Sequence, residues 1–448
     1  MSSSPRVIVV GAGLAGLVAS RHLAAAGADV TCLERRETVG GRVRTVTRGG
    51  FRLDRGFQVL FTGYPAVRRE LDLEALELRR FAPGAVLAGS DGRSTLGDPV
   101  RDPTALPATL RNGDVTLGDK LRVLRLRTAL ARRPLEFETV FAGGEDDESI
   151  AEYLRGRGFS ERFLENFAGP FYGGITLDRS LSTSKRVFEY TFAALAAGDI
   201  AVPANGMGSI TAQLASNARR AGATVETETA VTAIGEEPSA ALDSDEGTAE
   251  TESPVAVEVA NGGDRTADAV VLATDPKTAH ELTGLESIPT DARSCVTQYY
   301  RLPADVGLET GSRLLLNTGE RGPNHVVPHS DVAPEYAPEG ATLVSATFLG
   351  DREEGDGELA KLTRECLESW YRTRRFEGLE PIHTDRISFA QFAQPPGIHE
   401  TLPDVRDAGD GVYLAGEYTR WSSIQGAMES GRVAAKAVVD DYPRATGR

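Results

Sequence analysis

The amino-acid sequence predicts an α/β fold in which two domains are interleaved along one chain. An apolar strand, a glycine-rich turn, a helix and a second apolar strand follow one another within residues 6–34. A length of 448 residues exceeds what one hydrophobic core usually organises, so we expect two packed domains. Segments whose motifs belong with the first domain occur again in the middle and at the end of the chain. Long segments without such motifs separate them.

The first unit has the pattern of a Rossmann-like dinucleotide-binding domain. The run Arg6-Val7-Ile8-Val9-Val10 is typical of a strand buried on both faces, and Gly11-Ala12-Gly13-Leu14-Ala15-Gly16 follows it directly. In such a turn Gly11 permits the sharp bend, Gly13 lets the backbone approach a pyrophosphate, and Gly16 lets the helix pack closely on the strand. The unpaired N–H groups and positive dipole end of the helix then face the phosphates.

The second strand ends at Glu34, where a carboxylate can accept a hydrogen bond from a ribose hydroxyl. A carboxylate at this position repels a 2′-phosphate and disfavours NADP, while Arg35 beside it keeps that alternative open. A tight turn without a ligand is the structural alternative for the glycines. The complete strand–turn–helix–strand unit favours a bound dinucleotide.

Motifs further along the chain distinguish FAD from NAD. Gly40-Gly41-Arg42 follows the second strand, and the segment 50–58 reads Gly-Phe-Arg-Leu-Asp-Arg-Gly-Phe-Gln. Near the C-terminus, Val412–Glu417 forms a strand that ends in Gly-Glu, and residues 425–435 form a helix rich in small residues. Together with the segments 203–208 and 270–275, these motifs resemble, in the same order, the flavin-containing amine oxidase and phytoene desaturase superfamily.

The resemblance implies a Rossmann-like FAD-binding domain, an interleaved α+β substrate domain, and FAD that is bound without a covalent link. It places Arg42 against the pyrophosphate, Glu417 at a ribityl or ribose hydroxyl, and the helix opened by Ile424 and Gln425 at the flavin ring. A backbone contact of Val231 is expected at the adenine half. The expected cofactor-binding residues are Gly11, Gly13, Leu14, Ala15, Gly16, Glu34, Arg35, Gly40, Gly41, Arg42, Gly56, Phe57, Gln58, Val231, Gly416, Glu417, Ile424 and Gln425.

The motifs predict that each domain is built from separate pieces of the chain. The FAD-binding domain is expected to comprise residues 1–64, 202–284 and 396–448, and the substrate or cap domain residues 65–201 and 285–395. The first insertion has helical patterns near 118–131, 149–156 and 160–168; the second has strands near 296–302 and 342–349 and a helix near 357–372. We expect the active site between the two domains. Residues 236–254 are acidic and almost free of aromatics, which predicts a solvated, mobile loop.

No catalytic residue is identified by the sequence, and the pocket candidates are Gln58, Tyr299, Tyr418 and Trp421. Many flavoprotein amine oxidases carry a lysine on a substrate-domain strand near the flavin, but the strand at residues 295–302 holds none. This departure favours the desaturase side of the superfamily. Tyr418 and Trp421 are candidates for an aromatic wall over the flavin, with ordinary core packing as the alternative.

Composition excludes several classes of protein. No apolar run reaches the roughly 18–20 residues of a membrane span, and the N-terminus lacks the layout of a signal peptide. Three cysteines do not make a disulfide scaffold, and a net charge of −16 argues against nucleic-acid binding. His325 and His329 lack a Cys or carboxylate cluster, so we expect no metal site. The protein is expected to be cytoplasmic.

One basic segment stands out on this acidic chain. Residues 120–133 alternate leucines with Lys and Arg, a pattern that can rest on an anionic membrane surface or simply form a surface helix. A peripheral membrane contact therefore remains one of the two interpretations.

The leading functional hypothesis is a FAD-dependent oxidoreductase that dehydrogenates a small-molecule, hydrophobic substrate, of isoprenoid or carotenoid type, by hydride transfer to flavin N5. The electrons would pass to oxygen or to a quinone. The alternatives are a flavin-containing amine oxidase that uses oxygen, a flavin carrier without turnover, and an NAD-dependent dehydrogenase.

Overall fold

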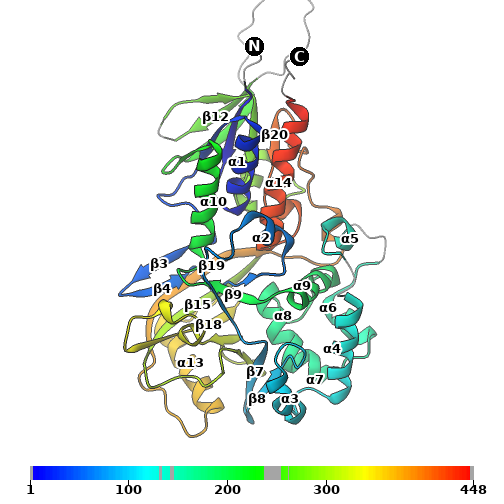
Figure 1. The fold of residues 1–448 in the computed structure, drawn as a ribbon, viewed down its shortest axis with the longest axis vertical. Helices are drawn as coiled ribbons and strands as arrows, with labels where there is room; N and C mark the ends of the chain where they lie inside the picture. The colour runs from blue at the N-terminus through cyan, green and yellow to red at the C-terminus, as the bar shows by residue number, and fades with distance from the viewer. Residues whose placement is uncertain (1–3, 131–133, 142–145, 237–253, 261, 444–448) are drawn as a thin grey trace, which may run out of the picture.

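A computed structural model describes residues 4–130, 134–141, 146–236, 254–260 and 262–443. The molecule is elongated, and the strand β1 (Arg6–Val10) and the C-terminal helix α14 (Ile424–Asp441) lie at the same end (Figure 1). The largest sheet lies at the other end. This arrangement brings the first and last segments of the chain into one domain.

A five-stranded parallel sheet forms the upper domain. Its strand order is β10 (Thr224–Glu226), β2 (Asp29–Leu33), β1, β14 (Ala269–Leu272) and β20 (Val412–Leu414). The central strands β1 and β14 are apolar and buried on both faces, as expected for a parallel sheet that is covered on each side. Strands from the beginning, middle and end of the chain therefore share one sheet.

Three helices cover one face of this sheet, with α1 (Leu14–Ala26) between α10 (Gly208–Ala221) and α14 (Figure 1). Small residues allow the close approach of α14: a Cβ added at Gly431 would lie 2.1 Å from the carbonyl oxygen of Ala15. On the other face lie a three-stranded antiparallel sheet, β11 (Val231–Glu236), β12 (Val255–Val259) and β13 (Arg265–Ala267), and the helix α11 (Pro276–Thr283).

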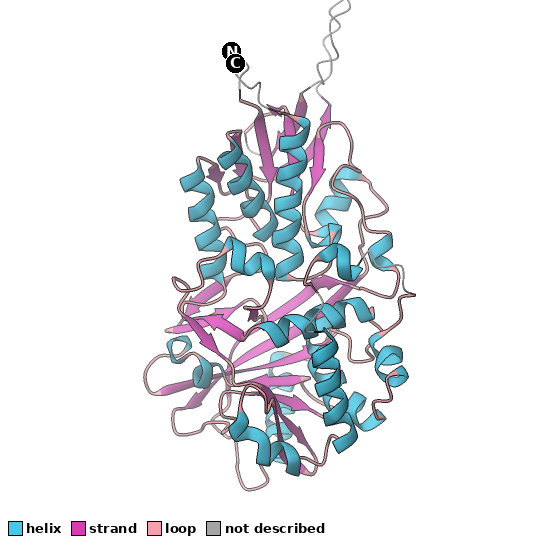
Figure 2. Cartoon of the chain, turned by 45° about the vertical axis from the view of Figure 1, so that its right-hand side comes forward, coloured by secondary structure: helices cyan, strands magenta, loops and turns pink. Residues whose placement is uncertain are grey.

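A seven-stranded sheet forms the lower domain. Its order is β19 (Glu380–Phe392), β15 (Ala292–Pro303), β18 (Ala341–Leu349), β17 (His325–Val327), β16 (Leu314–Asn317), β7 (Gly84–Gly89) and β8 (Gly92–Gly97). The helix α13 (Asp356–Trp370) packs on one face, and a group of helices packs on the other (Figure 2). That group comprises α3 (Leu106–Arg111), α4 (Leu117–Leu130), α6 (Ile150–Gly156), α7 (Glu161–Phe163), a π-helical turn (Leu164–Ala168), α8 (Gly169–Thr176) and α9 (Lys185–Ala197).

Short elements join the two domains. They are the hairpin β3 (Thr45–Arg48) and β4 (Phe51–Asp54), the small sheet β5 (Leu60–Phe61), β9 (Ile200–Pro203) and β6 (Leu78–Arg80), and the helices α2 (Pro65–Glu70), α5 (Phe137–Phe141) and α12 (His329–Val332). Phe61 of β5 and Ile200 of β9 line the cavity described below.

The predicted fold class, a Rossmann-like α/β domain with an interleaved α+β domain, is confirmed. The helices expected near 118–131, 149–156 and 357–372 are α4, α6 and α13, and the helix expected near 160–168 is divided into α7 and the π-helical turn. Most of the acidic segment 236–254, and the last residues of the basic segment 120–133, lie outside the described residues. No helix within the described ranges is long and apolar enough to cross a bilayer.

Candidate functional site

A cavity of about 400 Å³ runs from the Gly11 turn in the upper domain to β16 and β17 in the lower domain. This volume is in the range of small-molecule and cofactor sites. Most of the residues predicted at a cofactor line it: Gly11, Gly13, Leu14, Ala15, Glu34, Arg35, Gly40, Gly41, Arg42, Gly56, Phe57, Gln58, Val231, Gly416, Glu417 and Ile424. Trp421 lines it as well.

The turn between β1 and α1 forms a cradle of backbone N–H groups. Gly11 has φ +103°, and a Cβ there would lie 2.7 Å from the carbonyl oxygen of Ala273, so this position requires glycine. A Cβ on Gly13 would meet no chain atom within 4 Å and would instead occupy the cavity. Gly13 also provides no side-chain cap for α1, which leaves the N–H groups at the start of the helix available to an anion.

Glu34 is held at the end of β2 with its carboxylate at the cavity wall. Its Oε2 accepts a hydrogen bond from the backbone N–H of Ala12 (3.0 Å), and its Oε1 accepts one from that of Arg36 (3.0 Å). The residue is 4% exposed. Each oxygen keeps a further lone pair, so the fixed carboxylate can still accept from a ribose hydroxyl.

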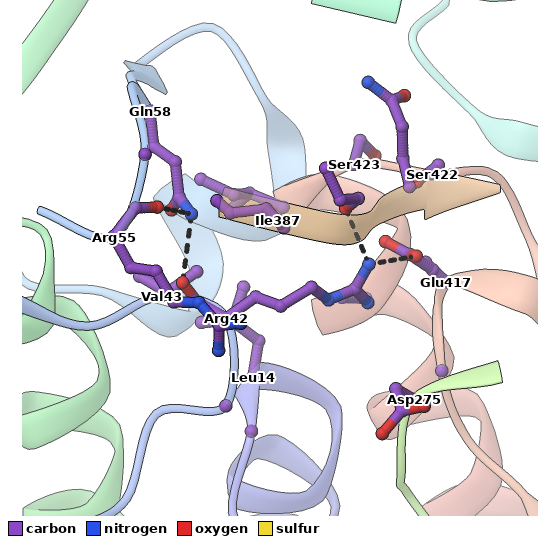
Figure 3. Close-up of a pocket in the computed structure, with 18 of the residues that line it drawn as sticks. Leu14, Arg42, Val43, Arg55, Gln58, Asp275, Ile387, Glu417, Ser422 and Ser423 are labelled. Carbon is purple, nitrogen blue, oxygen red and sulfur yellow. Dashed lines mark hydrogen bonds and ion pairs between the residues drawn. The ribbon is translucent and has the colours of Figure 1, made fainter. Parts of the chain in front are cut away.

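Arg42 extends across the cavity above Leu14 towards Glu417 (Figure 3). Its Nη1 lies 2.6 Å from Oε1 of Glu417 and donates to the carbonyl oxygen of Ala390 at 2.9 Å. The Gly40-Gly41 pair that precedes it has positive φ at both residues and is anchored by a hydrogen bond from the Gly40 N–H to the Ala12 oxygen (2.8 Å). The glycine pair thus lets the chain pass close to the cradle of N–H groups between β1 and α1, and it places Arg42 over that cradle.

The C-terminal element closes the cavity. The N–H of Gly416 donates to the Ser430 hydroxyl (2.9 Å), and the Ser423 hydroxyl accepts from the N–H of Gly426 (2.8 Å), which caps α14. Helix α14 begins at Ile424, as the sequence predicts, and Ile424 lines the cavity. The N-terminal end of a long helix is therefore directed at the ligand space.

Four predicted residues do not line the cavity. A Cβ on Gly16 would lie 1.9 Å from the Gly11 oxygen, so Gly16 serves helix–strand packing, and Gln425 accepts from the Ala66 N–H (2.7 Å), which joins α14 to α2. Tyr418 is fully buried in the core with its hydroxyl on the Leu272 oxygen (3.0 Å). The expectation that Tyr418 walls the pocket is therefore wrong. Tyr299 is also displaced from the cavity: its hydroxyl donates to the backbone oxygens of Asp54 (2.7 Å) and Gly56 (3.0 Å), behind the lining.

Trp421 is the aromatic candidate that does reach the cavity. It packs against Phe141 (ring centroids 4.9 Å apart) and Tyr190 (4.6 Å), and it is 1% exposed. Within the described part of the chain, its indole Nε1 has no hydrogen-bond partner, and neither has Oε1 of Gln58, which also lines the cavity. Buried polar atoms without partners are rare, and these two belong to residues that line the cavity.

The charged side chains of the lining are concentrated in the upper part. They are Glu34, Arg35, Arg36, Arg42, Arg55, Asp275 and Glu417, and all of them belong to the segments predicted to form the FAD-binding domain. Burial, followed by repulsion from Arg36, lowers the pKa of Arg55 from its ordinary value. Four guanidinium groups around the glycine cradle suit a pyrophosphate.

Among the described residues, the lining contributed by 65–201 and 285–395 contains no Asp, Glu, Lys or Arg. It consists of Pro170, Phe171, Gly174, Ile175, Thr176, Leu177, Val187, Thr191, Ile200, Leu314, Leu316, His325, Ile387, Ala390, Gln391 and Gln394. We call this part of the lining the cap chamber. Burial lowers the pKa of His325 to about 4, so its imidazole is neutral at neutral pH. Sequence reasoning missed these residues, since they carry no motif.

No lysine or cysteine occurs among the described residues that line the cavity. No group of three or more His, Cys, Asp or Glu in the described part of the chain is placed to hold a metal ion.

Comparison with known proteins identifies this arrangement. The profile of the family described as flavin-containing amine oxidoreductase matches residues 14–439. The chain belongs to this family. The flavin prediction is thereby confirmed over the NAD alternative, and the glycine cradle, Glu34 and the arginines fit FAD as the flavin.

Individual members resemble the chain over short stretches. Phytoene dehydrogenase of Streptomyces griseus is 44% identical over 92 residues, which are 19% of this chain and 18% of that protein. L-amino-acid oxidase of Sistrurus catenatus edwardsii is 44% identical over 80 residues, 18% of this chain and 16% of the other. The chain thus matches less than a fifth of the length of these curated relatives.

A solved structure shares the fold of this chain over almost its whole length. Cyclohexylamine oxidase from Brevibacterium oxydans IH-35A superposes with a TM-score of 0.69 at 18% identity, covering 99% of this chain and 100% of the other. At this identity the similarity establishes the fold alone.

Proposed function

We propose that this protein is a FAD-dependent oxidoreductase that dehydrogenates a hydrophobic, uncharged substrate, such as an isoprenoid, in the cap chamber. The observation that carries the proposal is the absence of Asp, Glu, Lys and Arg from the described residues of that chamber. A buried ammonium or carboxylate without a charged partner is costly, whereas an apolar molecule is stabilised by contact with Phe171, Ile175 and Leu316.

FAD would be held by the residues of the upper lining. The N–H groups at the start of α1 and the Arg42 guanidinium would bind the pyrophosphate, and Glu34 would accept from a ribose hydroxyl. Oε1 of Gln58 is an acceptor without a partner among the described residues. The N-terminus of α14, which begins at Ile424 in the lining, favours negative charge on a ligand. When bound, FAD supplies an acceptor for a hydride, which is one proton together with two electrons, from a substrate C–H bond. The chain contributes orientation and a chamber whose described lining is uncharged.

Anaerobic titration of the FAD-loaded protein tests this proposal. We expect bleaching of the yellow flavin by members of an apolar panel (phytoene, lycopene, squalene) and none by an amine panel (putrescine, benzylamine, cyclohexylamine). Bleaching by amines with release of hydrogen peroxide in air would establish the amine oxidase alternative. Bleaching by dithionite alone would favour a flavin carrier.

The electron acceptor can be identified in the second half of the same experiment. The lining has no lysine among its described residues, so the usual lysine that assists reaction with oxygen is missing from the wall. We propose that oxygen or a quinone takes the electrons. Mixing the reduced protein with air-saturated buffer or with anaerobic menadione, and following the return of flavin absorbance, distinguishes the two.

We also propose that α3 and α4 rest on an anionic membrane, from which a lipid-like substrate would enter. Leu106, Leu110, Leu117, Leu121 and Leu124 are 39–62% exposed, and the last three recur at helical spacing on one face of α4. Arg111 and Arg125 are exposed beside them on a chain whose net charge is −16. Exposed leucines with neighbouring cations are typical of interfacial helices.

Vesicle co-sedimentation tests the membrane contact. We expect binding to vesicles of phosphatidylglycerol and phosphatidylcholine, weaker binding to phosphatidylcholine alone, and loss of both in the Leu121→Gln/Leu124→Gln variant. Val46→Gln is the matched control, because Val46 is equally exposed (48%) on the distant hairpin β3–β4. Equal sedimentation of the wild type and the leucine variant would refute this contact.

A further inference from the structure

A single nitrogen-bearing ring, that of His325, lies in the wall of the cap chamber among its described residues. His325 opens β17 and pairs across the ladder with Leu316, which lines the same chamber. It is 3% exposed, and the Phe57 ring packs against it with centroids 5.1 Å apart. A Cβ on Gly174 would lie 3.2 Å from Nδ1, so the glycine lets α8 approach the imidazole closely.

The hydrogen bonds of Asn324 define which ring nitrogen carries the proton. The Asn324 amide nitrogen donates to the Pro170 carbonyl oxygen at 2.9 Å and lies 3.0 Å from Nδ1 of His325. Because a carbonyl oxygen only accepts, the atom that faces Pro170 must be the amide nitrogen and not the amide oxygen. Nδ1 of His325 therefore accepts, and the neutral ring carries its hydrogen on Nε2.

Among the described residues, no charged group contributes to the lowered pKa of His325, which has burial as its cause. The groups that face His325 are the Phe57 ring, the Asn324 amide, the Gly174 backbone and the neighbouring His329. Burial lowers the pKa of His329 to about 3, so that ring is neutral too, and its Nε2 is engaged with the Ser345 hydroxyl at 2.8 Å.

The Nε2 atom of His325 has no hydrogen-bond partner within the described part of the chain. A buried donor is normally satisfied, and a group left unpaired in an apolar wall marks a place where a ligand atom completes the bond. Trp421 provides an independent observation of the same kind, since it lines the cavity and its buried Nε1–H has no partner among the described residues.

We propose that His325 donates a hydrogen bond from Nε2–H to a neutral oxygen of the substrate, so that the substrate is an apolar molecule carrying a carbonyl, ether or hydroxyl oxygen. This inference rests on the proposed function and narrows its substrate class. A plain hydrocarbon of the same shape would leave the donor unpaired and would bind more weakly. His325 is then a specificity-determining residue. It lies at the end of the chamber where β17 of the lower sheet forms the wall.

A matched pair of ligands tests the inference on the FAD-loaded protein without any turnover. The probes are geranylacetone, an isoprenoid ketone, and its analogue in which C=CH₂ replaces C=O. Dissociation constants are measured from the perturbation of the flavin absorbance. We expect the ketone to bind about tenfold more tightly than the hydrocarbon, which corresponds to one productive hydrogen bond.

Variants assign this difference to the histidine. His325→Phe should remove the preference for the ketone, so that the two probes bind with similar affinity, while His325→Gln, which retains an N–H donor, should keep part of the preference. Leu316→Met is the matched control, because it alters the opposite position of the same ladder without altering polarity. Loss of the preference in Leu316→Met as large as that in His325→Phe would overturn the assignment.

A measurement on the wild-type protein keeps the inference falsifiable if His325→Phe does not fold. Nitrogen-15 spectra of histidine-labelled protein report the tautomer, and we expect protonated Nε2 whose proton resonance moves on addition of geranylacetone. An Nδ1–H tautomer, equal affinity for both probes, binding of neither probe, or a shift of this resonance on FAD loading alone would each refute the proposal. Failure of every substrate to bleach the flavin would count against the proposed function and leave these binding results standing on their own.

Discussion

The guanidinium of Arg42 and the carboxylate of Glu417 meet at 2.6 Å, although 375 positions separate them in the sequence. Glu417 is 6% exposed, and the pair lies at the wall of the cavity between the phosphate cradle and the N-terminus of α14. A buried ion pair is a weak source of stability, because desolvation offsets its attraction. We therefore infer that Glu417 holds the Arg42 guanidinium in position for an anionic ligand.

Replacement of Arg42 should weaken FAD binding. We expect Arg42→Met to raise the dissociation constant of FAD about 10–100-fold, since one charge-assisted hydrogen bond is worth about 1.5–3 kcal/mol. Quenching of flavin fluorescence during titration of the apoprotein measures this. Arg48→Met, at an exposed position of β3, is the control and should bind FAD like the wild type. Equal affinities of the two variants would show that Arg42 does not contact the cofactor.

Two glycines of one turn should respond differently to alanine. Gly13→Ala adds a methyl group that meets no chain atom within 4 Å, so we expect unchanged stability but a FAD affinity reduced by at least about tenfold, because the methyl enters the cradle. Gly16→Ala places a Cβ 1.9 Å from the Gly11 oxygen, so we expect the fold to lose about 1–3 kcal/mol or more. Urea unfolding of the apoproteins and FAD titration separate the two effects. Equal behaviour of the two variants would contradict this division.

Local motifs explain why much of the upper site could be predicted from the sequence. The turn Gly11–Gly16 and the start of α14 are each defined by a few adjacent residues whose backbone needs are specific. Glu34 and Glu417 follow apolar strands directly, and the carboxyl ends of parallel strands meet at one edge of a sheet. Chain order and strand ends were therefore sufficient to bring these residues together.

The cap chamber could not be predicted in the same way. The place of His325 depends on the register of β17 between β16 and β18, and its proton depends on Pro170, which comes from a helix 155 positions earlier in the chain. Tyr418 lies in a short helical turn, where alternation gives no guide to the direction of a side chain. The pairing of distant segments, which produces the chamber, leaves no periodic signal in one sequence. The domain boundaries stay a prediction.

Asp54 should give the folded protein a distinctive pH response. Burial raises the pKa of its carboxyl to about 6, against hydrogen bonds from Thr45 (2.5 Å), the Met207 N–H and Tyr336 (both 2.8 Å). Its pKa in the folded state exceeds that in the unfolded chain, so its protonation stabilises the fold at low pH, and this contribution is lost as the pH rises from about 4 to about 6.

The variant Asp54→Asn isolates that response. The stability of the wild type minus that of Asp54→Asn should fall across pH 4–6, by at most about 1.4 kcal/mol per pH unit, and stay constant above about pH 6.5. Urea-unfolding curves at half-unit steps of pH measure the difference. Val46→Gln, at an exposed position of β3 without a titratable group, should show no such slope. A constant difference for Asp54→Asn would mean that Asp54 is ionised throughout.

His325 should impose the opposite dependence. Burial lowers its pKa to about 4, below the ordinary value of 6.5. Between these two pH values the imidazole is protonated in the unfolded chain and neutral in the folded protein. Its contribution to stability is complete above about pH 6.5 and is lost as the pH falls towards 4. His329 and His399, whose pKa values burial lowers to about 3, act in the same direction.

The wild-type protein should therefore lose stability steeply on mild acidification. The variant His325→Phe should lose less, because one of the buried imidazoles is absent. The wild-type free energy of unfolding should fall between pH 6.5 and 5, and the slope in His325→Phe should be smaller by up to about 1.4 kcal/mol per pH unit, which is the effect of one proton. Leu316→Met is the control, since it changes the ladder partner of His325 and adds or removes no titratable group. An unchanged slope in His325→Phe would show that the imidazole is protonated in the folded protein, and a charged ring could not serve a chamber without carboxylates.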